Sequence, residues 1–183
     1  HKMNGGSFQN YQDKSYLKLT EEQIQKHLDG EHHIGVYPLL QDNTSWFIVA
    51  DFDKKDWQIQ ALEFIKLCEK HNIPAYLEKS RSGNGGHVWI FFNQPYPAVK
   101  SRKIFLQLLE DCGAVSKLDK SGSFDRLFPN QDYLSGKGLG NLIAFPLNKK
   151  CWEKGNNCFI HPETLEPIAN QWEFLSKIEK LDI

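Results

Sequence analysis

The chain has 183 residues, of which 25 % are charged and 40 % apolar, as expected for one compact domain with a hydrophobic core. Its formal net charge of −1 excludes an overall basic surface for nucleic acid, so any such contact must be a local patch. No apolar run reaches the roughly 18 residues of a membrane span, and the first residues lack a signal-peptide pattern. The sequence therefore predicts a cytoplasmic protein with no membrane contact. Residues 1–3 resemble a cloning remnant and are set aside.

The four cysteines favour a reduced setting. Cys68 and Cys112 fall on the apolar faces of predicted helices, where free cysteine behaves as a small hydrophobic residue. Cys151, Cys158 and His161 are spaced C-x6-C-x2-H, which matches no common zinc pattern and lacks an evident fourth ligand. Whether these three bind zinc is left open.

The first elements follow a polar, glycine-rich lead-in. Thr20 and Gln23 form a capping-box start for a helix that runs to about Leu28. Residues 34–40 are expected to form a strand, with Pro38 at an edge or bulge. A turn at 41–44 then predicts a hairpin with the strand that follows.

That following strand, residues 46–53, is the most informative stretch of the sequence. Five apolar residues, 46–50, indicate a strand buried on both faces. Side chains alternate along a strand, so Asp51 and Asp53 share a face. Two adjacent carboxylates repel each other, and a divalent cation is the usual remedy. The alternative is that both acids lie in a solvated turn or cap the next helix.

The rest of the first two thirds alternates between helix and strand. Helices are expected at 57–71, with Asp56 as N-cap, and at 98–111, with Val99, Phe105, Leu108 and Cys112 on one face. Strands are expected at 75–79, 86–92 and 123–128, a loop at 80–85 and a turn at 93–97. The order from 46 to 128 is thus β-α-β-β-α-β, the ferredoxin-like or RRM-like unit of an α+β fold.

The topology of this unit predicts the site. Right-handed crossovers give the spatial strand order 4-1-3-2, with the first strand antiparallel to both neighbours. The end of the first strand, with Asp51 and Asp53, then lies beside the start of the third, with His87, and of the fourth, with Asp125. Three acids and a histidine therefore converge at one end of adjacent strands.

Alternation also divides the two faces of the sheet. The site face is expected to carry Phe47, Val49, His87, Trp89, Phe91, Asp125 and Leu127, and the opposite face, with Ile48, Ala50, Val88, Ile90 and Phe124, to pack the helices. The site face is too apolar to remain open to water. We expect a single domain in which residues 46–128 form the catalytic core, and 4–45 and 129–183 form a second small α/β lobe across a cleft. That lobe includes strand candidates at 139–147 and 158–160, and a closing helix at 171–181 with Trp172, Leu175 and Ile178 inward.

The residues at the cleft suggest phosphoryl-transfer chemistry. Asp51, Asp53 and Asp125 could hold two Mg²⁺ or Mn²⁺ ions, which prefer oxygen ligands. The glycines of the loop at 80–85 allow close backbone approach to a triphosphate, and the hydroxyls and amides of this loop donate hydrogen bonds. The nucleotide-binding candidates are Lys79, Ser80, Arg81, Ser82, Gly83, Gly85, His87 and Asn130.

Each candidate has a plainer interpretation. The loop could be an ordinary hairpin connection, His87 a core histidine, and Asp125 an acid paired with Arg126. Asp132 competes with Asp125 for the third ligand position. The lysines at 137, 149 and 150 could line a nucleic-acid groove or simply be solvated.

The D-x-D, S-x-S-G-x-G-x-H and apolar-Asp motifs resemble those of the archaeo-eukaryotic primase superfamily, and the match is closest to the primase-polymerase domains of TOTE conflict systems and their CRISPR-associated relatives. The resemblance extends over nearly the whole chain from about residue 20. It is carried by residues 33–40, 49–54, 78–92, 124–132, 138–147 and 170–175.

This resemblance implies template-directed transfer of nucleotides from NTPs or dNTPs with two Mg²⁺ or Mn²⁺ ions. By motif match, Asp51, Asp53 and Asp125 are metal ligands, and Ser80, Ser82 and His87 contact the triphosphate. It also implies a DNA or RNA template-primer, and a helicase in the same full-length protein or operon. Asn170 stands where the family is expected to have Asp, and is assigned no catalytic role. No zinc-binding primer-synthesis element is evident, so initiation, as opposed to extension, is left open.

Two other functions remain compatible with these residues. A metal-dependent nuclease could use the same acids but would not need the triphosphate loop. A non-catalytic RRM-like module would bind nucleic acid or nucleotide, but RRMs place stacking aromatics where this sheet carries carboxylates.

Overall fold

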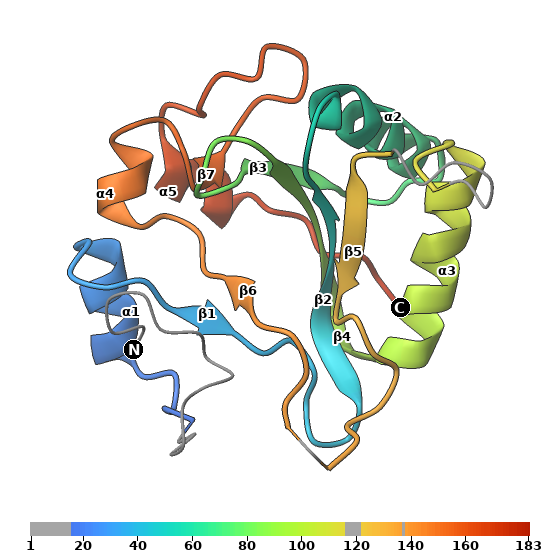
Figure 1. Ribbon diagram of the computed structural model, residues 1–183, viewed down its shortest axis with the longest axis horizontal. Helices are drawn as coiled ribbons and strands as arrows, with labels where there is room; N and C mark the ends of the chain where they lie inside the picture. The colour runs from blue at the N-terminus through green and yellow to red at the C-terminus, as the bar shows by residue number, and fades with distance from the viewer. Residues whose placement is uncertain (1–15, 116–121, 137) are drawn as a thin grey trace.

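The computed structural model describes residues 16–115, 122–136 and 138–183. Within these ranges the helices are α1 (Glu21–Leu28), α2 (Trp57–Lys70), α3 (Ala98–Asp111), α4 (Lys149–Trp152) and α5 (Gln171–Ser176). The strands are β1 (Gly35–Val36), β2 (Thr44–Phe52), β3 (Tyr76–Lys79), β4 (Gly86–Pro97), β5 (Phe124–Phe128), β6 (Ile143–Ala144) and β7 (Cys158–Phe159) (Figure 1). None of the helices described combines the length and apolar character needed to cross a membrane.

The main sheet has five strands in the order β5-β2-β4-β3-β7, and every neighbouring pair is antiparallel. The first four strands in this order reproduce the predicted arrangement, so the α+β class and the β-α-β-β-α-β topology are confirmed. β7 adds a fifth strand beside β3, where Glu78 pairs with Phe159 and Lys79 with Cys158.

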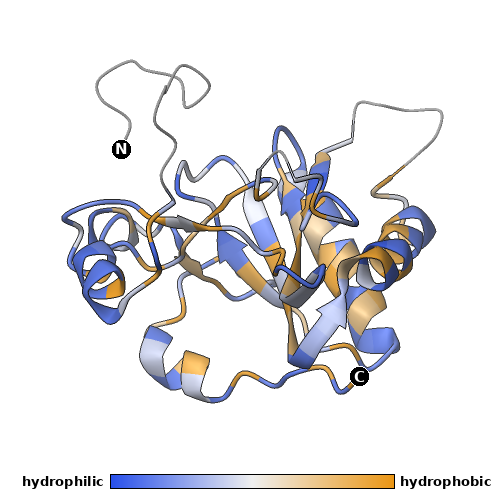
Figure 2. Ribbon diagram, turned by 90° about the horizontal axis from the view of Figure 1, so that it is seen from below, coloured by the Kyte–Doolittle hydropathy of each residue, from blue (hydrophilic) through white to orange (hydrophobic). Residues whose placement is uncertain are grey.

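Helices α2 and α3 cover one face of the sheet, on the right of Figure 1. Ile48, Ala50, Val88 and Ile90 point into this layer and are at most 1 % exposed, as predicted. Burying a large apolar side chain contributes roughly 1.5–3 kcal/mol, so this layer is the main source of stability. Figure 2 shows apolar residues on the strands of the sheet and on the two helices that pack against it.

A second, smaller cluster packs on the opposite face. Its buried members are Val49, Trp89, Phe128, Ile143 and Phe159, and Val36, Ile168 and Phe174 pack against them. β1 and β6 form a separate two-stranded sheet on this side (Figure 1). Segments from before residue 46 and after residue 128 therefore cover the site face away from its acidic end.

Two features around β2 differ from expectation. The predicted hairpin of residues 34–40 with β2 is wrong, because β1 pairs with β6 instead. Both edges of β2 are already occupied, by β4 and β5, so no edge is left for an adjacent hairpin partner. Residues 93–97, predicted as a turn, continue β4, and Thr44 pairs with Pro97.

The C-terminal prediction is also partly wrong. α5 ends at Ser176 instead of about residue 181, and Trp172 is 53 % exposed instead of inward. Leu181 forms an isolated parallel bridge with Phe92 at the edge of β4. The strand expected at 139–147 is limited to Ile143–Ala144.

The helix starts show how far capping can be predicted. Thr20 caps α1 as expected, and its hydroxyl oxygen accepts the Gln23 N–H at 3.3 Å. Asp56 precedes α2 as expected, but its backbone is left-handed, with φ 66°, and its side chain makes no capping hydrogen bond. Capping residues normally have extended backbone, so this geometry explains the lost cap.

Candidate metal and nucleotide site

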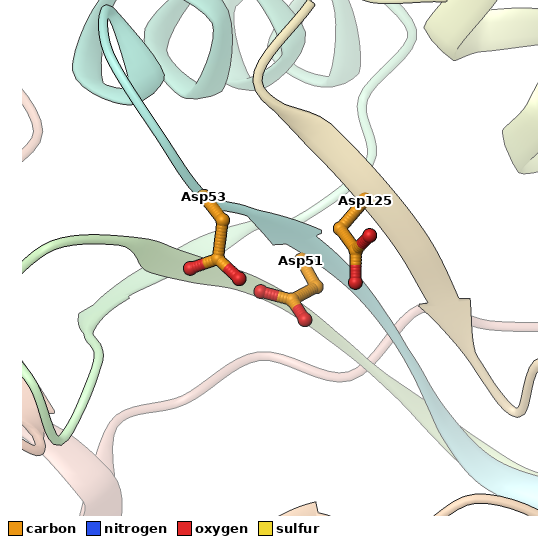
Figure 3. Close-up of side chains that lie close together, drawn as sticks. All are labelled: Asp51, Asp53 and Asp125. Atoms are coloured by element: carbon orange, nitrogen blue, oxygen red, sulfur yellow. The ribbon is translucent and has the colours of Figure 1, made fainter.

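Three carboxyl groups meet at the end of β2. Asp51, Asp53 and Asp125 each offer an oxygen, and these oxygens lie within 4.8 Å of one another. Figure 3 shows the carboxyl groups pointing toward one another, with Asp51 and Asp53 coming from the end of β2 and Asp125 from β5. Among the described residues this is the one group of three or more potential ligands found, and the predicted convergence is therefore present.

A β-bulge places Asp125 in this group. Asp51 pairs with Arg126 and Phe52 pairs with Phe124, so Asp125 has no partner of its own on β2. Residues in a bulge are re-aimed relative to the regular alternation, and bulges are common next to active sites. The same extra residue moves Leu127 to the helix face, where it joins the main core, so its predicted place on the site face is wrong.

The Asp51 carboxyl group is the buried member of the three. Its pKa is raised to about 6, mainly by burial and in smaller part by the nearby charges of Asp53 and Asp125, while His87 and Arg126 act in the opposite direction. Like charges and desolvation thus disfavour the ionised form. A bound cation would offset this cost, so the three carboxyl groups are suited to holding a metal ion.

His87 stands between two acids in a row that crosses three strands. It pairs with Asp51 of β2 on one side and with Glu78 of β3 on the other. Its Nδ1 lies 2.9 Å from the Glu78 Oε2, and its Nε2 lies 3.5 Å from the Asp51 Oδ1. Burial disfavours the charged ring, but Glu78 outweighs this by charge and hydrogen bond, with help from Asp51 and Asp53, so the pKa of His87 is raised.

Glu78 is a site neighbour that the sequence analysis did not single out. Its side chain is fully buried and also accepts hydrogen bonds from the Trp89 indole at 2.8 Å and the Asn157 amide at 2.9 Å. The sequence could have predicted that Glu78 lies opposite His87, because the two residues are equally distant from the middle of the 80–85 loop. In a hairpin such residues stand opposite each other.

The loop between β3 and β4 lies beside the acids. The Ser80 and Ser82 hydroxyls are 3.1 Å apart, the Asn84 N–H donates to the Ser82 hydroxyl at 3.2 Å, and the Ser80 N–H donates to the Gly85 carbonyl at 2.9 Å. A Cβ atom built on Gly85 would lie 2.3 Å from the Asp53 Oδ1 and 2.6 Å from the Phe52 carbonyl oxygen. Only glycine allows the loop to approach the acids this closely.

A pocket of about 710 Å³ opens next to these residues. It is lined by Asp53, by residues 54–58 at the start of α2, and by Gly83 and Asn84 of the loop.

The other nucleotide-binding candidates differ in how exposed they are to solvent. Arg81 and Ser82 are exposed and Lys79 is half-buried. Asn130 follows Pro129 after β5, and within the described residues its side chain makes no hydrogen bond to the loop or the acids.

The structure also locates the competing residues. Asp125 does pair with Arg126, at 2.6 Å, while remaining in the acid group. Asp132 instead pairs with Arg102 at 2.7 Å and lies outside that group. Cys151, Cys158 and His161 do not form a ligand group within the described chain. Lys149 and Lys150 are exposed in α4, and Lys137 lies outside the described residues.

The donor set fits a hard divalent cation. Three carboxylates provide oxygen ligands only, the set preferred by Mg²⁺ and Mn²⁺ and poorly suited to zinc. One carboxylate is buried, and the other two are more open to solvent, which leaves room for water or a phosphate oxygen.

Comparison with known proteins agrees with the geometry. The family model of the archaeo-eukaryotic primase domain of TOTE conflict systems matches residues 1–183. No curated protein matches the chain. Membership in this superfamily implies a nucleotidyltransferase of the primase type, and such domains generally use divalent metals. The predicted resemblance is confirmed, and the chain belongs to the archaeo-eukaryotic primase domain family of TOTE conflict systems.

Proposed function

We propose that this domain is a primase-polymerase that adds nucleotides from NTPs or dNTPs to a DNA or RNA strand on a template. The observation that carries this proposal is the carboxylate group of Asp51, Asp53 and Asp125 directly against a glycine-rich loop. A nucleotidyl transferase needs a metal-binding group and a triphosphate-binding group side by side, and the close approach of the loop to the acids supports these two roles.

The three aspartates would hold two Mg²⁺ or Mn²⁺ ions. Such ions, when bound, would activate the attacking 3′-hydroxyl and neutralise charge on the leaving pyrophosphate. The carboxylates fix the ligand positions because β2 and β5 hold them from two backbone segments. Preorganised charge of this kind costs no rearrangement during reaction.

The loop and His87 would orient the triphosphate. The Ser80 and Ser82 hydroxyls can donate hydrogen bonds, and Lys79 and Arg81 add positive charge. The His87 Nε2 points toward the acid group, where it would donate to a phosphate oxygen. In the reaction the 3′-oxygen forms a bond to the α-phosphorus as the bond to pyrophosphate breaks, so these contacts would aid both alignment and departure.

The covered site face argues against a simple RRM-like binding module. Trp89 is 3 % exposed, and it lies in the cluster that β6 and β7 help to bury. Base stacking on an open sheet would need such aromatic residues to be accessible. A metal-dependent nuclease would not need a glycine-rich loop against the acids.

A primer-extension assay with labelled NTPs and dNTPs, with and without primer, tests the proposal. Incorporation should require Mn²⁺ or Mg²⁺, and each of Asp51→Asn, Asp53→Asn and Asp125→Asn should lower it by on the order of 100-fold or more. Asp132→Asn is the matched control, because Asp132 pairs with Arg102 outside the acid group, and it should keep incorporation within about twofold.

The same assay distinguishes the alternatives. Metal-dependent cleavage of the labelled strand without extension would indicate a nuclease. Nucleotide incorporation that survives Asp51→Asn and Asp53→Asn unchanged would contradict the mechanism. Reactions without primer report separately whether the domain initiates strands or only extends them.

A further inference from the structure

We propose that Glu78 is a positioning residue that fixes His87 for contact with the triphosphate, and this inference rests on the proposed function. Glu78 does not itself reach the acid group or the loop surface. Glu78 on β3 pairs with His87 on β4, which in turn pairs with Asp51 on β2, so His87 separates Glu78 from the acid group. The Glu78 side chain is fully buried.

Glu78 receives three hydrogen bonds and is surrounded by donors. Its Oε2 accepts from the His87 Nδ1 at 2.9 Å and the Trp89 Nε1 at 2.8 Å, and its Oε1 accepts from the Asn157 Nδ2 at 2.9 Å. An indole nitrogen can only donate. A carboxylate, which only accepts, is therefore the side chain that satisfies this site.

The donors around Glu78 are themselves held in place. The Asn157 side-chain oxygen accepts the Asn148 N–H at 3.0 Å, and its amide also donates to the Phe145 carbonyl at 3.2 Å. These bonds fix which end of the Asn157 amide faces Glu78. The Trp89 ring is packed in the second hydrophobic cluster. Glu78 thus has little freedom to turn.

The fixed position of Glu78 in turn fixes the orientation of the His87 imidazole. With the Nδ1–H bonded to Glu78, the ring plane is set and the Nε2 is directed to the acid group, 3.5 Å from the Asp51 Oδ1. Carboxylate partners of metal-ligating histidines fix the ring and its tautomer in this way, and losing one costs about 10- to 100-fold in metal affinity or activity, so we expect a similar effect on a histidine that faces a phosphate. A histidine without this partner could rotate away from the phosphate.

A double-mutant cycle tests whether Glu78 acts through His87. Affinity for ATP and dATP, each with Mn²⁺, is measured by calorimetry in wild type, Glu78→Gln, His87→Asn and the double variant. Glutamine keeps the shape but offers one acceptor oxygen to three donors. We expect Glu78→Gln to weaken binding about 10-fold or more, and to have less than a twofold effect when His87 is already replaced.

A second readout needs neither nucleotide nor metal. The Nδ1–H proton resonance of His87, identified among the seven histidines by its absence in His87→Asn, should move or disappear in Glu78→Gln. Should Glu78→Gln fail to fold, Trp89→Phe removes one donor while keeping an aromatic ring. Its smaller loss of affinity should likewise vanish in the His87→Asn background.

The outcomes separate this inference from the proposed function. Wild-type protein that binds nucleotide, combined with effects of Glu78→Gln that are equal in both backgrounds, would overturn the positioning role alone. An unchanged His87 resonance in Glu78→Gln would do the same. Wild-type protein that binds no nucleotide would contradict the proposed function and this inference together.

Discussion

Asp51 carries a charge that the folded chain makes costly. Its pKa is about 6 in the fold against an ordinary value of 3.8, mainly because burial disfavours the ionised form. The folded state therefore binds the proton more tightly than the unfolded chain. The resulting penalty is absent below about pH 4, grows as the pH rises, and is complete above about pH 6.

Asp51→Asn should consequently stabilise the metal-free protein at pH 8 while removing incorporation. The pKa difference sets an upper limit of about 3 kcal/mol on the gain. Thermal denaturation in EDTA at pH 8 and pH 4 measures it, and the gain should shrink at pH 4. A variant less stable than wild type at pH 8 would show that the Asp51 carboxylate is favourable in the metal-free fold.

At the scale of elements, the contact between the glycine-rich loop and the end of β2 sets the site. Gly85→Ala would bring a Cβ atom to 2.3 Å from the Asp53 Oδ1 and 2.6 Å from a backbone oxygen. The backbone cannot yield cheaply, so we expect a loss of about 1–3 kcal/mol in the free energy of unfolding and a loss of metal affinity. Denaturant titration and Mn²⁺ binding measure the two effects.

Gly138→Ala is the matched control for this prediction. Among the described residues, a Cβ atom there would meet only the Tyr16 hydroxyl, at 3.6 Å, which is an ordinary contact. Stability and Mn²⁺ affinity should both stay near wild type. Equal losses in the two variants would mean that close packing of the loop against Asp53 is not the cause.

The elements also show what pattern can predict. Apolar runs and capping signals located β2, β3, β4, β5, α2 and α3 because each carries a strong local period. The carboxylate group followed from the strand order alone. The bulge at Asp125 did not, because it depends on how β5 registers against β2, and no local pattern in residues 123–128 reveals that pairing.

Long-range pairing limited the remaining predictions. β1 and β6 are two residues each and pair across about a hundred residues, so their sequences alone do not specify a partner. Glu78 illustrates the same limit at the site. Its significance comes from three donors on β4 and the segment before β7.

For the whole molecule, a metal that binds only the folded chain should raise its stability. A free Mn²⁺ concentration 100 times the dissociation constant adds about 2.7 kcal/mol, which for a domain of this size raises the melting temperature by several degrees. Thermal denaturation with and without Mn²⁺ measures the shift, and excess EDTA should reverse it. The variant with all three aspartates changed to asparagine should show no shift, whereas Asp132→Asn should respond like wild type.

The segments that close the edge of the main sheet come from far along the chain. β7 pairs with β3 some 80 residues earlier, and the Leu181 N–H donates to the Phe91 carbonyl at 2.7 Å. During synthesis, β3 and β4 therefore leave the ribosome long before the residues that protect them. Unpaired strand edges are prone to associate with other chains. Folding of this domain should thus be slow and sensitive to protein concentration, and a nascent chain halted before residue 158 should depend on chaperones to stay monomeric.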